Sequence, residues 1–178
     1  RGGQSGGNGG VVETSGTNFD LSGIRVGASA PAGTAGRWIL DPANVTIASG
    51  TASGSLPSDP FAPLFDSTVQ DGDINAALNK GTSVTIATTT PNGNSAGGDI
   101  TFLEGVQIIV GSGTLPVDFN LLAWRDITGF DTSIQSTAAP LNVNFAAGLG
   151  GNSGIVNFTS SEFSTNGGND AKRAMGNG

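Results

Sequence analysis

The side chains of this sequence that are suited to acid–base chemistry are carboxylates, because its 178 residues include 14 Asp and Glu but no His, Cys or Tyr. Without those three residue types, Ser-His-Asp and Cys-His nucleophilic sites, the usual zinc sites and a tyrosine acid are excluded. A glycosidase needs only two carboxylates. The acidic residues considered are Glu13, Asp20, Asp41, Asp71, Asp73, Glu104 and Asp126. Their distribution along the chain shows no pair of evident purpose, so we predict no catalytic residue.

Arg125 and Asp126 place a basic residue beside a carboxylate. Polysaccharide lyases built on β-helices generally use such a basic residue together with calcium-binding aspartates. On a strand, however, adjacent side chains point to opposite faces. We therefore expect these two residues to form a corner ion pair or to bond the backbone.

Two short stretches suggest binding motifs. Residues 71–73 (Asp-Gly-Asp) resemble the start of a calcium loop, but Thr82 stands at the twelfth position, where an EF-hand has Glu. Residues 7–10 (Gly-Asn-Gly-Gly) lack the Gly-Lys-Ser and the strand-to-helix context of a phosphate loop. We expect Asp71 or Asp73 to cap a helix, and we predict neither a metal site nor a cofactor site.

The two tryptophans, Trp38 and Trp124, are candidates for stacking on sugars. Both lie in apolar stretches, where a large aromatic side chain more often belongs to the core. We therefore predict a core position for each.

Composition narrows the class of protein. Only 12% of the residues are charged and the net charge is −7, with the seven basic residues scattered. Nucleic-acid binding needs clustered Lys and Arg, so we expect no such partner. No apolar run reaches the 18 residues of a membrane helix, and no signal peptide opens the chain. We interpret the chain as a processed or excised part of a secreted, extracellular or cell-surface protein, rich in Ser, Thr, Asn and Gly.

Short strands separated by turn residues dominate the pattern. Residues 37–40 and 45–47 flank the turn 41–44 (Asp-Pro-Ala-Asn), and residues 11–26 read as two further strands. The later strand cores are residues 84–86, 100–102, 106–110, 121–124, 141–145 and 155–158. They recur roughly every 20 residues, a spacing typical of solenoid repeats.

We predict a single domain over residues 1–178. Residues 48–70 contain three prolines and no alternation, which indicates an insertion or lid. Residues 71–81 form the one good helix pattern, with Gly81 at its end. Residues 166–178 read as a polar tail, and the Gly-rich residues 1–10 as a linker or the end of a preceding coil.

Several blocks of the sequence, in order and spacing, resemble the passenger region of filamentous-haemagglutinin-type adhesins. The blocks are residues 9–16 (Gly-Gly-Val-Val-Glu-Thr-Ser-Gly), 21–23 (Leu-Ser-Gly), 36–42 (Gly-Arg-Trp-Ile-Leu-Asp-Pro), 77–85 (Ala-Leu-Asn-Lys-Gly-Thr-Ser-Val-Thr), 98–101 (Gly-Asp-Ile-Thr), 121–127 (Leu-Leu-Ala-Trp-Arg-Asp-Ile), 140–143 (Pro-Leu-Asn-Val) and 164–168 (Ser-Thr-Asn-Gly-Gly). The Asn-Pro-Asn-Leu and Asn-Pro-Asn-Gly-Ile motifs of that family's secretion domain do not occur. The chain therefore resembles an internal segment of such a passenger, or a small relative.

The resemblance implies an all-β fold, a right-handed parallel β-helix, with export by two-partner secretion and surface adhesion. The expected function is that of a non-enzymatic surface protein of adhesin type, forming or belonging to a filament, with a surface carbohydrate or protein as its possible receptor. Two alternatives stay open: a self-polymerising fibre subunit without a receptor, and a carbohydrate-active β-helix enzyme.

The predicted interior follows from alternation along the strands. Its members are Trp38, Ile39, Val45, Ile47, Val84, Ile86, Ile100, Phe102, Ile108, Leu122, Val143 and Phe145. A β-helix also has two ends with unpaired strands, and residues 1–10 and 166–178 offer little apolar surface to cover them. We therefore expect copies to add end to end, or flanking coils of a longer passenger to cover the ends.

Overall fold

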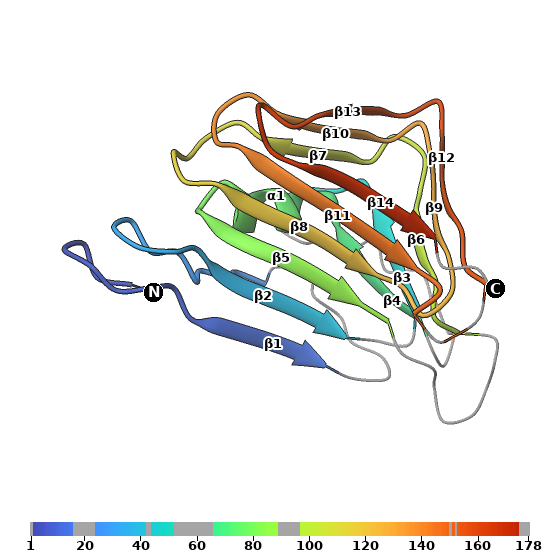
Figure 1. Ribbon diagram of the computed structural model, residues 1–178, viewed down its shortest axis with the longest axis horizontal. Coiled ribbons are helices and arrows are strands. Elements are labelled where there is room, and N and C mark those ends of the chain that lie inside the picture. The colour runs from blue at the N-terminus through green and yellow to red at the C-terminus, as the bar shows by residue number, and fades with distance from the viewer. Residues whose placement is uncertain are drawn as a thin grey trace.

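A computed structural model describes residues 2–15, 24–41, 44–51, 66–88, 97–149, 151 and 153–174 (Figure 1). Within these ranges the chain forms 14 strands and one helix, α1 (Asp71–Leu78). The strands form three sheets, and every strand pairing in them is parallel. This confirms the predicted all-β class. Among the described residues, no helix has the length and apolarity needed to span a bilayer.

Sheet 1 is the largest of the three sheets. Its strands, in spatial order, are β1 (Val11–Ser15), β2 (Gly36–Asp41), β5 (Thr82–Ala87), β8 (Val117–Leu122), β11 (Leu141–Ala147) and β14 (Asp170–Ala174). Sheet 2 runs in the order β4 (Asp66–Gln70), β3 (Asn44–Ala48), β6 (Ile100–Phe102), β9 (Ile127–Phe130) and β12 (Val156–Thr159). Sheet 3 contains β7 (Gln107–Val110), β10 (Ser133–Ser136) and β13 (Glu162–Ser164).

The chain visits the three sheets in turn. From β5 it passes to β6 and β7, then to β8, β9 and β10, then to β11, β12 and β13, and it returns to sheet 1 at β14 (Figure 1). Each circuit lies on the one before it, so equivalent residues of successive coils stand side by side.

In-register pairing stacks the interior side chains into columns. One column of sheet 1 contains Trp38, Val84, Phe119 and Val143, and a second contains Leu40, Ile86, Leu121 and Phe145. All eight side chains are buried, none exceeding 1% exposure. Phe145 also contacts rings from the other two sheets, with centroids 6.5 Å from Phe102 and 6.2 Å from Phe163. These contacts join the three sheets around one core.

Ten of the twelve residues predicted for the interior are buried, and Trp38 is fully so. Ile39 and Leu122 were wrong predictions, because both are only half-buried. Their neighbours Leu40 and Leu121 take the interior positions instead. Both errors fall in apolar runs, where the sequence gives no alternation from which to read the phase. Trp124, also predicted as core, is half-buried as well.

The segment boundaries differ from the prediction in three places. The helix is shorter than residues 71–81, because it ends at Leu78 and continues as a turn to Gly81, whose φ is +71°. Within the predicted insertion 48–70, residues 66–70 form β4, which pairs with β3 at the edge of sheet 2. Within the predicted tail 166–178, residues 170–174 form β14 on β11. The three prolines of the insertion lie outside the described residues.

Two further predictions concern the N-terminal part of the chain: the two strands in residues 11–26 and the Gly-rich segment 1–10. Residues 11–15 form a strand, but residues 24–30 do not, and the part between them lies outside the described residues. The Gly-rich segment 2–10 is held by residues 28–36 of its own chain. The Gly2 N–H donates to the Ser29 carbonyl and the Gly9 N–H donates to the Thr34 carbonyl, each at 2.9 Å. A neighbouring subunit is therefore not needed to order this segment.

Candidate functional site

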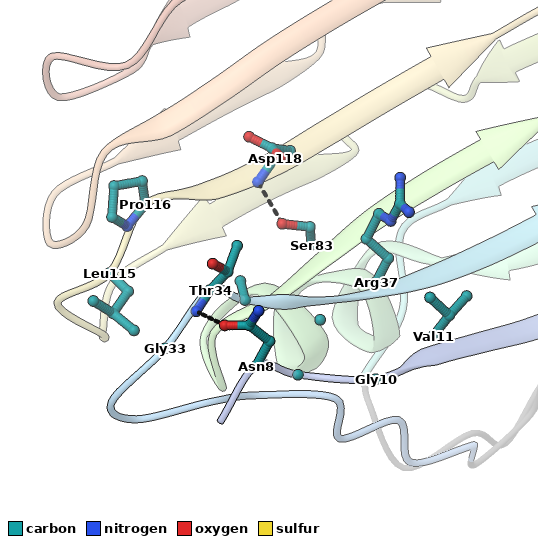
Figure 2. Close-up of a pocket in the computed structure, with 13 residues that line it drawn as sticks. Asn8, Gly10, Val11, Gly33, Thr34, Arg37, Ser83, Leu115, Pro116 and Asp118 are labelled. Atoms are coloured by element: carbon teal, nitrogen blue, oxygen red, sulfur yellow. Dashed lines mark hydrogen bonds between the residues drawn. The ribbon is translucent and has the colours of Figure 1, made fainter. Parts of the chain in front are cut away.

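A groove of about 580 Å³ opens on the outer side of sheet 1, near the starts of its strands (Figure 2). Loop residues 8–11 and 33–37 form one wall, and residues 115, 116 and 118 form the other. Ser83 of β5 lies between them. The groove thus joins segments that are more than 100 residues apart in sequence.

Glycine allows the two N-terminal loops of the groove to lie against each other. A Cβ atom at Gly9 or at Gly36 would collide with the carbonyl oxygen of Ala28. The Asn8 side-chain oxygen accepts a hydrogen bond from the Thr34 N–H at 3.1 Å, which fixes the same contact (Figure 2). Residues 7–10, which lack the features of a phosphate loop, therefore have a role in packing.

A chain of polar contacts runs up the outer face of sheet 1 from the groove. The Asp118 N–H donates to the Ser83 hydroxyl at 2.9 Å (Figure 2), and the Asn142 side-chain amide donates to the Asp118 carboxylate at 2.7 Å. The Asn169 N–H then donates to the Asn142 side-chain oxygen at 3.0 Å. We call the side chains of Ser83, Asp118 and Asn142 the polar ladder.

Arg37 and Asp118 give the groove two opposite charges. Arg37 is exposed, and it aligns with Ser83 on the neighbouring strand. Since Asp118 lies one strand further along the sheet, the backbones of Arg37 and Asp118 are two strand spacings, about 10 Å, apart. The pair suits a polar ligand that carries both acceptors and donors. Among the described residues that line this groove, Asp118 is the one carboxylate, whereas glycoside hydrolysis by the usual route needs two.

Arg125 and Asp126 lie in the bend between β8 and β9, so the opposite-face argument made for a strand does not apply to them. Arg125 pairs with Asp99 of the previous coil, with Nη2 and Oδ2 2.8 Å apart. The Asp126 carboxylate accepts the Ile155 N–H of the next coil at 2.9 Å. The two residues therefore connect successive coils at one corner. This agrees with the expectation that they form a corner ion pair or bond the backbone.

Asp71 does not cap α1, contrary to the prediction. The N-cap residue is Gln70, and no side chain bonds the first turn as a cap. The Asp71 carboxylate instead accepts the N–H groups of Gly50 and Gln107, both at 2.9 Å. It therefore fastens the helix to the chain on either side.

Asp73 is the most unusual carboxylate of the described structure. Its side chain is 1% exposed, both of its oxygens lack a hydrogen bond, and Arg25 Nη1 approaches its Oδ1 at 3.7 Å. Burial raises the pKa of Asp73 above its ordinary value, and the positive charge of Arg25 opposes part of that rise. Asp73 and Asp71 thus have different surroundings.

The helix presents a row of polar side chains to the edge of sheet 3. The Asn75 amide donates to the Gln107 carbonyl and accepts the Ile109 N–H, both at 2.8 Å. The Asn79 amide donates to the Ile109 carbonyl at 2.7 Å and accepts the Gly111 N–H at 2.8 Å. Together with Asp71, these residues occupy the place of a strand beside β7. The sequence signal was their spacing of four, which puts all three on one helix face.

The remaining candidates lie apart from one another or fall outside the described residues. Trp38 is buried, and its indole N–H donates to the Thr14 hydroxyl at 3.2 Å. Glu13 and Glu104 are exposed on separate segments. Asp20 lies outside the described residues, and Asp41 ends β2. Within the described ranges, no three Asp, Glu, His or Cys residues come together in a way that would hold a metal.

Comparisons with protein-family models and with curated proteins find no match to this chain. The family resemblance therefore rests on the sequence blocks alone.

Proposed function

We propose that the chain is a right-handed parallel β-helix that serves as a non-enzymatic, extracellular surface protein of adhesin type, belonging to a filament. The handedness follows the rule that crossovers between parallel strands are almost always right-handed. The adhesin role rests on the resemblance to filamentous-haemagglutinin-type passengers. Its partners would be a surface carbohydrate or protein receptor, with flanking coils or further copies along the filament.

The stacking of the coils is the observation that carries this proposal. Three parallel sheets share one closed core, so each coil supports the next and the outer faces are free to vary. The polar ladder and the groove lie on such an outer face, where Arg37 and Asp118 offer charges of both signs. A rigid stack that displays polar side chains on its sides suits a spacer or a binding surface.

Labelling of the producing cells with an antibody against the chain tests this proposal. We expect staining of intact cells, or recovery of the protein from the medium, and loss of the stain after external protease. Staining that appears only after permeabilisation would contradict a surface role. A cytoplasmic protein of the same cells serves as the control for intact envelopes.

The carbohydrate-active alternative is tested on the purified chain. Incubation with a panel of polysaccharides, followed by assays for new reducing ends and for unsaturated products, is expected to give the blank value. If products form, the Asp118→Asn variant shows whether the groove is responsible, because it removes the one carboxylate among the described lining residues while keeping the size of the side chain.

A further inference from the structure

The groove of sheet 1 opens on the side of the stack rather than at one of its ends. Arg37, Ser83 and Asp118 lie on its floor, one on each of the strands β2, β5 and β8 (Figure 2). Each of these three strands has a hydrogen-bonded neighbour on both sides. The floor of the groove is therefore complete within the described residues.

Both walls of the groove are fixed by contacts within the chain. On one side, the Arg37 N–H donates to the Gly10 carbonyl at 2.9 Å, which ties the two N-terminal loops together. On the other side, the Asn79 side-chain oxygen accepts the Ser112 N–H at 2.8 Å, so the loop that leads to Leu115 is tied to the end of α1. A preformed site binds a ligand at a smaller entropic cost than a site that must first be ordered.

Arg37 brings a positive charge to the groove. Its side chain is exposed, and it takes part in no ion pair with another described residue. A guanidinium presents parallel N–H donors that match the two oxygens of a carboxylate. The β2 side of the groove is therefore suited to hold a carboxylate.

Ser83 and Asp118 supply groups that suit hydroxyls. Ser83 is 3% exposed and its oxygen accepts the Asp118 N–H, so the hydrogen of this hydroxyl is left to donate into the groove. The Asp118 carboxylate accepts the Asn142 amide through Oδ1 at 2.7 Å, and within the described structure Oδ2 is left for a donor of the ligand. A donor and an acceptor thus lie side by side on the floor.

We propose that this groove binds an acidic oligosaccharide, with a sugar carboxylate on Arg37 and sugar hydroxyls on Ser83 and Asp118. Sugar hydroxyls both donate and accept hydrogen bonds, as the floor requires. The groove volume of about 580 Å³ is typical of sites for small ligands, and the separation of about 10 Å between the backbones of Arg37 and Asp118 calls for more than a single sugar. A protein interface generally buries about 1,000 Å² or more, which exceeds what such a groove offers. The assignment rests on the adhesin role and names the kind of receptor.

Isothermal titration calorimetry of the purified chain tests this assignment with two acidic probes, trigalacturonate and sialyllactose. Each probe has a neutral counterpart: the methyl ester of trigalacturonate and lactose. We expect saturable binding of at least one acidic probe, and binding of its neutral counterpart that is weaker by about tenfold or more, because the hydrogen bonds to a charged partner are lost.

Variants locate the binding in the groove. Arg37→Gln is expected to weaken the binding of the acidic probe by about tenfold or more, and Asp118→Asn by several-fold. Lys80→Gln removes the same charge at an exposed position that does not line the groove, and it is expected to bind within about twofold of the wild type, since a distant exposed charge is screened by salt. Circular dichroism confirms that each variant is folded.

Three results would overturn the assignment. The first is no saturable binding of either acidic probe at millimolar concentration, the second is equal binding of an acidic probe and its neutral counterpart, and the third is equal weakening by Arg37→Gln and Lys80→Gln. Antibody labelling of cells measures the surface location separately. A chain that is labelled on intact cells but binds neither probe would refute the ligand and leave the surface role standing, and a chain that binds a probe but stays inside the cell would refute the surface role alone.

Discussion

The side-chain oxygen of Asn75 accepts a hydrogen bond from the backbone N–H of Ile109 at 2.8 Å. This contact replaces the strand that would otherwise lie beside β7. Because Asp71 and Asn79 make equivalent contacts one turn to either side, α1 satisfies the N-terminal edge of sheet 3 through side chains rather than through its backbone.

The Asn75→Ala variant is expected to lower the free energy of unfolding by about 1 kcal/mol, since a backbone donor and a backbone acceptor of β7 exchange their protein partners for water. Urea unfolding followed by circular dichroism measures the change. Lys80→Ala, at an exposed position of the following turn, serves as the control and is expected to stay within about 0.5 kcal/mol of the wild type. Equal losses in the two variants would contradict the role given to Asn75.

Asp73 predicts an unusual pH dependence of stability. Its folded pKa is raised above the ordinary value of 3.8, so the folded state holds this proton more tightly than the unfolded state. The contribution of Asp73 is therefore fully present below pH 3.8 and is lost as the pH rises through the folded pKa.

The Asp73→Asn variant removes this titration, so the difference in Tm between variant and wild type should move in the variant's favour as the pH rises from acid to neutral. Thermal unfolding across this pH range measures the difference. Asn157→Ala, which replaces an exposed residue and alters no titrating side chain, is the control. A difference that is constant with pH would show that Asp73 has the same pKa in both states.

Gly129 makes room for an aromatic ring. A Cβ atom at this position would lie 2.5 Å from Cε1 of Phe158, and that ring packs edge-on against Phe102 with centroids 5.2 Å apart. The Gly129→Val variant should therefore cost about 1–3 kcal/mol through overpacking.

Calorimetry measures this loss, and the Gly129→Val/Phe158→Leu double variant serves as its partner. Because leucine vacates the space that valine needs, the double variant is expected to be more stable than the sum of the two single changes predicts. Strict additivity would mean that residues 129 and 158 do not compete for the same volume.

Phe145 joins the three sheets and should be the most costly truncation among the phenylalanines. Phe145→Ala is expected to lose about 3–5 kcal/mol, and Phe145→Leu markedly less, because leucine fills more of the cavity. Phe130→Ala is the matched control, since Phe130 is 51% exposed. Similar losses at residues 130 and 145 would contradict the single shared core.

Where apolar and polar residues alternate along the sequence, this alternation was enough to predict both the strands and their interior side chains. Val84 and Ile86 are examples, and both are buried. The same rule failed at Ile39 and Leu122, because an unbroken apolar run does not show which of its residues point into the core. The strands β9, β10 and β13 were not predicted, because each has only three or four residues and few apolar ones.

Contacts between segments far apart in the sequence were beyond prediction. Asn75 and Ile109 are 34 residues apart, and only the fold brings them together. Lys172 appeared to belong to a polar tail, because charged residues in a strand are informative only when the register of the neighbouring strand is known. The groove between Arg37 and Asp118 depends on long-range pairing in the same way.

Parallel pairing of successive coils is the central claim, and the nuclear Overhauser effects between β5 and β8 test it most directly. Ile86 and Leu121 are aligned in these strands. We predict contacts between amide and α protons across the pair, with no close contact between α protons, because only antiparallel strands bring α protons together. Strong contacts between α protons of β5 and β8 would contradict the parallel stack and the proposals built on it.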